Sequence, residues 1–161
     1  MERTLSPEMV APFIISNTIA LLILWFSFRN IRVAKGILGL LFVGAGIFNI
    51  YTVFSNPSAY LSYADTAVFS LYEEFIRGRF ADYSVTIISI ISILQFYIGF
   101  SMMYDDWRFK SACIGGIIFG LAIAPLGVGS AFPSSVILST SFMVMLIITR
   151  RNEKFNSIDK K

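Results

Sequence analysis

Residues 111–149, SACIGGIIFGLAIAPLGVGSAFPSSVILSTSFMVMLIIT, contain no charged side chain, and the way this stretch folds decides the architecture of the chain. As one straight helix, rising about 1.5 Å per residue, it would be nearly twice as long as the ~30 Å hydrocarbon core of a bilayer. Helix breakers and small polar residues interrupt it between Pro125 and Ser135. We therefore predict a helical hairpin of two membrane spans, 111–128 and 133–149.

The composition of the 161-residue chain indicates an integral membrane protein. Hydrophobic residues make up 56% of the sequence and charged residues only 14%, and the mean hydropathy is +0.73. This is far more apolar than the usual soluble domain. The net charge of +3 is small, and the basic residues lie at the ends of apolar runs instead of in one patch. We expect the lipid bilayer as a partner and no nucleic acid.

Three further apolar runs are long enough to span a bilayer, at residues 10–28, 37–54 and 85–104. Between the second and third runs, apolar residues recur at helical spacing in segment 58–78, with polar residues at the other positions. Its polar face is acidic on balance, so anionic lipid would not attract it. We expect an amphipathic outer helix packed over the mouth of an all-α bundle of five helices, and a polar tail at 150–161.

The distribution of Lys and Arg predicts the orientation of these spans. With five spans, one side of the membrane holds most of the basic residues: Arg29, Arg32, Lys35, Arg108, Lys110, Arg150, Arg151, Lys154, Lys160 and Lys161. The other side holds only Arg3, Arg77 and Arg79. We therefore expect a multi-pass protein of the cell membrane with its N-terminus outside and its C-terminus in the cytoplasm.

Two residue types limit the chemistry of the chain. It has no histidine, which excludes a histidine-ligated haem and removes the commonest metal ligand and general base. Cys113 is the only cysteine, so there is no paired-cysteine redox or metal site. Four methionines offer soft metal ligands, but packing is the favoured interpretation: Met102, Met103, Met143 and Met145. No catalytic constellation is visible, and we expect neither a metal site nor enzyme activity of the chain by itself.

Uncharged polar side chains inside the predicted spans are the candidates for a binding site. No Asp, Glu, Lys or Arg lies inside a predicted span, which disfavours a proton relay or an ion-coupled carrier. Amides and hydroxyls lining a cavity would bind the carbonyl groups of a quinone or a lipid headgroup. The candidate ligand-binding residues are Asn17, Asn49, Gln95, Tyr97 and Thr140. Alternatively, these amides bond only across helices, which is worth about 0.6–2 kcal/mol in membranes.

Two segments carry motifs of a known kind of membrane bundle. The first is the glycine-rich Gly36-Ile-Leu-Gly-Leu-Leu-Phe-Val-Gly-Ala-Gly46, followed by Pro57 and an outer helical segment. The second is 93–123, with Leu-Gln-Phe-Tyr-Ile-Gly-Phe and a short charged turn. Together they resemble the first three helices of the DoxX-like membrane family, over roughly residues 35–149. The resemblance implies a four-helix bundle, here with an added N-terminal helix, and an association with quinone-linked redox complexes.

Two classes of function fit these observations. The first is a small bundle that binds a quinone or a lipid, or that serves as the membrane subunit of an oxidoreductase complex beside a membrane redox partner. The second is a non-enzymatic transporter or an assembly or structural protein. A homo-oligomer is compatible with both classes.

Overall fold

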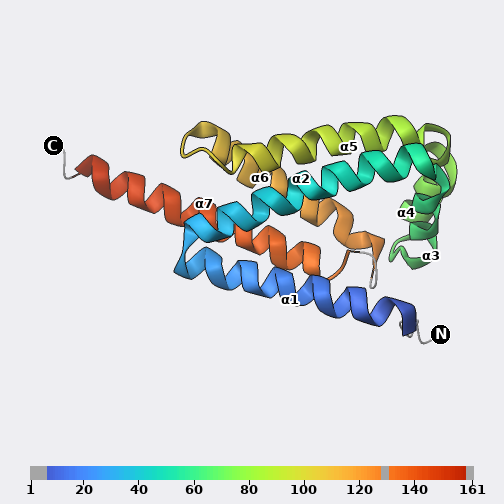
Figure 1. Cartoon of the computed structure of the whole chain (residues 1–161), viewed down its shortest axis with the longest axis horizontal. Helices are drawn as coiled ribbons and strands as arrows, with labels where there is room; N and C mark the ends of the chain where they lie inside the picture. The colour runs from blue at the N-terminus through green and yellow to red at the C-terminus, as the bar shows by residue number, and fades with distance from the viewer. Residues whose placement is uncertain (1–6, 128–130, 159–161) are drawn as a thin grey trace.

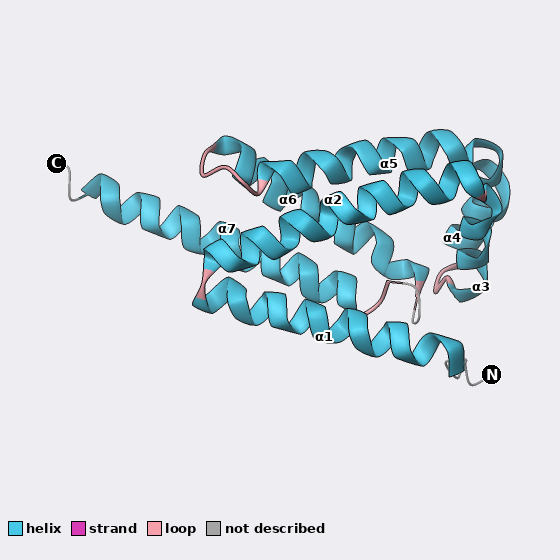
Figure 2. Ribbon diagram, in the orientation of Figure 1, coloured by secondary structure: helices cyan, strands magenta, loops and turns pink. Residues whose placement is uncertain are grey.

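The computed structural model describes residues 7–127 and 131–158. Within them the chain is helical and has no strand (Figure 1, Figure 2). The long helices are α1 (Pro7–Arg29), α2 (Ile31–Ser55), α5 (Ala81–Ser101), α6 (Trp107–Ile123) and α7 (Ser134–Ile158). In this described part, five helices are long and apolar enough to cross a membrane. The predicted all-α membrane bundle is confirmed.

The five long helices form a ring. α2 packs against α5, α5 against α6 and α6 against α7, and α1 closes the ring by packing against both α7 and α2 (Figure 1). Large apolar side chains cover the outside of the ring: Leu40 is 78% exposed and Phe48 is 65% exposed. An exposed apolar surface of this extent is favourable in contact with lipid and unfavourable in contact with water. The chain is a multi-pass membrane protein.

Glycines set the spacing between neighbouring helices. A Cβ atom added at Gly116 of α6 would overlap the ring of Phe142 on α7. Gly99 of α5 lies equally close to α2, because an added Cβ would be 2.7 Å from Cγ2 of Val43. These positions admit no side chain, which allows the close helix approach typical of membrane bundles.

The second helix begins earlier than the predicted span at residue 37. Asn30 is the single residue between α1 and α2, and its Oδ1 accepts a hydrogen bond from Val33 N at 3.3 Å. This N-cap starts α2 at Ile31. Lys35 therefore lies inside the helix, in its second turn.

The predicted hairpin forms, but its first helix ends early. α6 ends at Ile123 and is followed by the short 3-10 helix η3 (Ala124–Leu126), and Gly127 then takes a φ of 94°. The predicted span end at Val128, with the turn through Ser130, lies outside the described residues.

The last helix is longer than the predicted span 133–149. α7 continues to Ile158, through most of the predicted polar tail. Lys110 on α6 forms an ion pair with Glu153 on α7, with Nζ 2.6 Å from Oε2. The polar extension thus stays helical beside the start of α6, and residues 159–161 of the tail lie outside the described residues.

Residues 57–80 cover one end of the ring and are called the lid segment below (Figure 1). Instead of the single helix expected at 58–78, it consists of four short pieces: η1 (Pro57–Ser62), α3 (Tyr63–Thr66), α4 (Ser70–Phe75) and η2 (Ile76–Phe80). The last piece is a π-helical turn that leads directly into α5. The segment therefore follows the end of the bundle instead of crossing it as one rod.

Hydrogen bonds to η3, the short helix that follows α6, explain why the lid segment is interrupted. Val68 N donates to the carbonyl of Pro125 at 2.9 Å, and Thr66 Oγ1 donates to the carbonyl of Leu126 at 2.7 Å. Because the amide of Val68 donates to Pro125, it cannot also donate to a carbonyl within a helix, and the helix is interrupted between α3 and α4. The sequence pattern shows the apolar face of the segment but not these distant acceptors.

Candidate ligand-binding cavity

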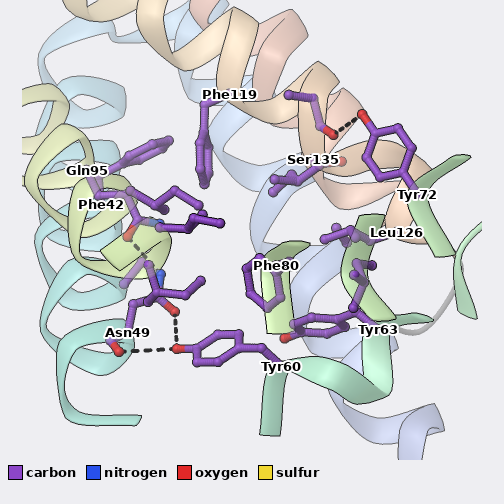
Figure 3. A pocket seen from close by; sticks show the side chains of 18 of the residues that line it. Phe42, Asn49, Tyr60, Tyr63, Tyr72, Phe80, Gln95, Phe119, Leu126 and Ser135 are labelled. Carbon is purple, nitrogen blue, oxygen red and sulfur yellow. Dashed lines mark hydrogen bonds between the residues drawn. The ribbon is translucent and has the colours of Figure 1, made fainter. Parts of the chain in front are cut away.

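A cavity of about 560 Å³ lies inside the ring, beneath the lid segment. Helices α2, α5, α6 and α7 form its walls (Figure 3). On one side of it, Phe42 packs edge to face against both Phe119 and Phe142, with ring centroids 5.8 and 5.4 Å apart. The lining is mostly apolar and contains no Asp, Glu, Lys or Arg. Its volume is in the range of sites for small organic ligands.

A polar cluster on the cavity wall joins α2, α5 and the lid segment. Asn49 Nδ2 donates to Gln95 Oε1 at 2.8 Å. The hydroxyl of Tyr60 donates to Asn49 Oδ1 at 3.0 Å and lies 3.2 Å from the backbone carbonyl of the same residue (Figure 3). All three residues line the cavity. Asn49 thus uses both ends of its amide, as a polar group in an apolar interior must.

Gln95 of this cluster and two further polar groups on the lining, Tyr63 and Ser135, have donor capacity that the described residues do not use. Gln95 is buried, and its amide nitrogen makes no hydrogen bond in the described part of the chain. The hydroxyl of Tyr63 likewise has no partner there, and the buried Oγ of Ser135 is unpaired. Figure 3 shows Gln95 and Ser135 on opposite walls. These groups are able to donate to acceptors on a bound molecule.

Burial affects the hydroxyl groups of two of the three tyrosines in the lid segment, Tyr60 and Tyr63. It raises the pKa of Tyr60 and the pKa of Tyr63 above the ordinary value of 10.0. Both phenols are therefore neutral at physiological pH. A neutral phenol donates one hydrogen bond, so the cavity offers donors without offering charge.

The structure brings two of the five predicted site residues to the cavity and places the other three elsewhere. Asn49 and Gln95 line it. Asn17 on α1 and Thr140 on α7 each donate to a carbonyl four residues earlier in their own helix, at 2.8 and 2.9 Å. The hydroxyl of Tyr97 lies 2.6 Å from Ser111 Oγ, between α5 and α6 and outside the cavity lining.

Sequence reasoning missed the contributions of the lid segment and of α7. Tyr60 and Tyr63 lie outside the predicted spans, where a polar aromatic side chain gives no signal of a site. Ser135 lies two residues after Pro133, in the run of helix breakers and small polar residues that predicts a turn. The helical spacing of the lid segment does predict packing over the bundle mouth, and that packing is what brings the two phenols to the cavity.

A buried cation at the opposite end of the bundle was also missed. Lys35 Nζ donates to the carbonyl of Tyr104 and to Asp105 Oδ1, the latter at 2.6 Å, and lies 4.2 Å from the ring centroid of Phe109. Its side chain is only 11% exposed. Lys35 thereby ties α2 to the turn between α5 and α6. It does not line the cavity.

The described residues contain no group of three or more His, Cys, Asp or Glu side chains that would hold a metal ion. The four methionines do not lie together, since Met102 and Met145 are buried in the core and Met103 is 81% exposed.

No protein-family model matches the chain, and comparisons with curated proteins and with solved structures also give no match. The fold and the cavity together define a helical membrane bundle with an internal cavity whose described lining residues are uncharged.

Proposed function

We propose that the protein binds a neutral lipophilic molecule with a carbonyl group, a quinone or a lipid, in the cavity beneath the lid segment. The observation that carries this proposal is the unused donor capacity of Gln95 and Tyr63 in an otherwise apolar cavity. An unpaired donor in an apolar interior costs free energy, and a ligand carbonyl would remove that cost.

The ligand reaches this site from the bilayer. The cavity lies within the ring of membrane-spanning helices, and two of its lining residues are exposed at the surface, Phe75 of α4 and Ala122 of α6. An apolar edge on the lipid-facing surface favours a molecule dissolved in the membrane over a water-soluble solute. The uncharged lining also argues against ion-coupled transport, which relies on ionisable residues within the membrane.

A bound quinone would make the chain the membrane subunit of a redox complex, as the DoxX-like resemblance implies. The chain has no histidine, and its single cysteine, Cys113, is buried. The groups that transfer electrons to or from a quinone would therefore belong to a partner protein. This chain supplies the binding site and its orientation in the membrane.

The arrangement of basic residues supports an orientation in the cell membrane. Eight of them lie in or beside the helix ends opposite the lid segment: Arg29, Arg32, Lys35, Arg108, Lys110, Arg150, Arg151 and Lys154. In the lid segment, Arg77 forms ion pairs with Asp65 and Glu73, at 2.7 and 3.1 Å. Because basic residues collect on the cytoplasmic side, we propose that the lid segment faces outside.

Filling the cavity tests the binding proposal. Ala45 lines the cavity one turn before Asn49, so Ala45→Phe places a ring beside the polar cluster. Gly44→Phe is the matched control, because Gly44 is exposed and a Cβ added there meets nothing within 4 Å. The purified proteins in nanodiscs are titrated calorimetrically with decylubiquinone and with monoolein, and lipid extracts of each are examined by mass spectrometry.

We expect the wild type and Gly44→Phe to bind one of the two probes with equal affinity, and Ala45→Phe to bind it at least about tenfold more weakly. Binding of decylubiquinone alone identifies a quinone site, and binding of monoolein alone identifies a lipid site. Equal binding by all three proteins, or by none, would overturn the proposal and favour the scaffold or assembly class.

A further inference from the structure

A second, smaller hollow lies under α1. It measures about 360 Å³ and is called the α1 groove below. Pro12, Ile15, Ser16, Ile19 and Ala20 form its α1 side. Leu41 of α2 and Ser134 and Leu138 of α7 form the other side. The α1 groove therefore follows the seam that α1 covers between α2 and α7.

The α1 groove and the main cavity share a wall. Leu41 and Leu138 line both of them. Both leucines are only half-buried and pack at the edge of the apolar core. Two side chains, one from α2 and one from α7, thus face both spaces, and a change of rotamer at either leucine alters the wall between them.

The α1 groove offers a polar ligand no free hydrogen-bond donor among its lining residues. Its two hydroxyls are already used, because Ser16 Oγ donates to the carbonyl of Phe13 at 3.0 Å and Ser134 Oγ donates to the carbonyl of Ala131 at 2.9 Å. The other lining residues are apolar. On its outer side the groove borders the lipid, since Ile15 is 58% exposed and Ile19 is 40% exposed. A hydrocarbon chain is the occupant that matches this surface.

We propose that the ligand of the main cavity carries one long hydrocarbon chain, acyl or isoprenoid, and that this chain passes between Leu41 and Leu138 into the α1 groove. The inference rests on the proposed function and narrows its ligand class. A carbonyl head is held at Gln95, and the tail leaves the cavity through the seam beneath α1. α1 thereby forms the cover of the tail site, in addition to closing the ring.

The test compares probes that differ only in the tail. Decylubiquinone is paired with ubiquinone-1, and monoolein with monocaprylin, so that the two pairs separate a quinone head from a lipid ester. Ser16→Phe narrows the α1 groove from an exposed position. Thr18→Phe is the control, because Thr18 is also exposed on α1 but does not line the groove. Affinities are measured in nanodiscs and expressed per bilayer lipid. The stronger partition of the long-tailed probes into the membrane then does not raise their measured affinity.

For the pair that binds, we expect the long probe to bind about tenfold more tightly than the short one in the wild type and in Thr18→Phe, and the difference to fall below about threefold in Ser16→Phe. A decyl probe with a terminal diazirine should label a peptide from Pro7–Arg29. Equal binding of long and short probes to the wild type, or a length preference unaffected by Ser16→Phe, would overturn the tail site. Loss of binding in Ala45→Phe would still support the main cavity in that case, whereas no binding of any probe would overturn both.

Discussion

Asn49 and Gln95 differ in how much of their hydrogen-bonding capacity the protein itself uses. Asn49 accepts from Tyr60 and donates to Gln95, at 3.0 and 2.8 Å. Gln95 accepts that bond but makes no donor bond within the described residues. The first amide therefore links the helices and the lid segment, and the second keeps a hydrogen-bond donor for the proposed ligand. Both interpretations of the sequence, structural bond and binding site, are compatible with this geometry.

A double-mutant cycle tests this pairing. Asn49→Leu and Gln95→Leu should each lower the free energy of unfolding in detergent by about 0.6–2 kcal/mol per lost bond. Gln95→Leu removes the bond to Asn49, whereas Asn49→Leu removes the bonds to both Gln95 and Tyr60. The double variant should lose less than the sum of the two single losses, since neither amide is then left alone. The measurement is equilibrium unfolding of the wild type and the three variants.

Thr140→Val serves as the control for this cycle. Thr140 is exposed and its hydroxyl bonds only within α7, so the change should alter stability by less than about 0.5 kcal/mol. Strictly additive losses for Asn49 and Gln95 would contradict the direct bond. In ligand titrations, Gln95→Leu should weaken binding more than Asn49→Leu, because the donor offered to the ligand belongs to Gln95.

At the scale of elements, the contact between the lid segment and the end of α6 decides whether the cavity stays covered. The hydrogen bonds of this contact include those of Thr66 Oγ1 to Leu126 O and Val68 N to Pro125 O, both in η3, and that of the Tyr72 hydroxyl to Ala122 O of α6 at 2.9 Å. Gly127 lies against it with a φ of 94°, and a Cβ added there would overlap the carbonyl oxygen of Thr66. The turn and the lid segment therefore fit together only with glycine at this position.

Gly127→Ala should loosen the lid segment. Gly127 has φ 94° and ψ −179°, a backbone conformation that essentially only glycine adopts and that costs alanine about 1–3 kcal/mol. The overlap with Thr66 also pushes the two elements apart. Hydrogen–deuterium exchange of peptides from 57–80 should become at least about tenfold faster, while exchange in α6 and α7 stays slow. Gly44→Ala is the control, because its added Cβ meets no atom within 4 Å. Unchanged exchange in 57–80 would show that this contact does not hold the lid segment.

For the molecule as a whole, the sequence predicts those features that depend on local patterns. Apolar length predicts the five spans, and breakers such as Pro125 predict the hairpin. The sequence predicts only part of the polar cluster, Asn49 and Gln95. It does not predict Tyr60, because the fold of the lid segment, and not a sequence spacing, brings Tyr60 to Asn49. Tyr97 and Asn49 are both polar residues within predicted spans, so the sequence does not distinguish them. The rotation of each helix about its axis decides that Asn49 lines the cavity and Tyr97 does not.

The orientation in the membrane is also a property of the whole chain. Five membrane-spanning helices place the two ends of the described chain on opposite sides, and the basic residues favour the cytoplasm for the end that holds Arg108 and Lys110. Asp82 is exposed near the lid segment, and Trp107 is 68% exposed at the other end. Single cysteines at these two positions therefore report opposite sides of the membrane.

In a Cys113→Ser background, Asp82→Cys should react with a membrane-impermeant maleimide on intact cells, and Trp107→Cys should react only after the cells are permeabilised. The background protein without either cysteine should remain unlabelled, and this control matters because Cys113 is buried in the native chain. Labelling is read as a mass shift of the purified protein. Labelling of Trp107→Cys from outside, with Asp82→Cys protected, would mean that the bundle is inverted and that the lid segment and its cavity end face the cytoplasm. Labelling of both from outside would contradict the placement of α5 as a membrane span, because Ala81–Ser101 separates the two positions.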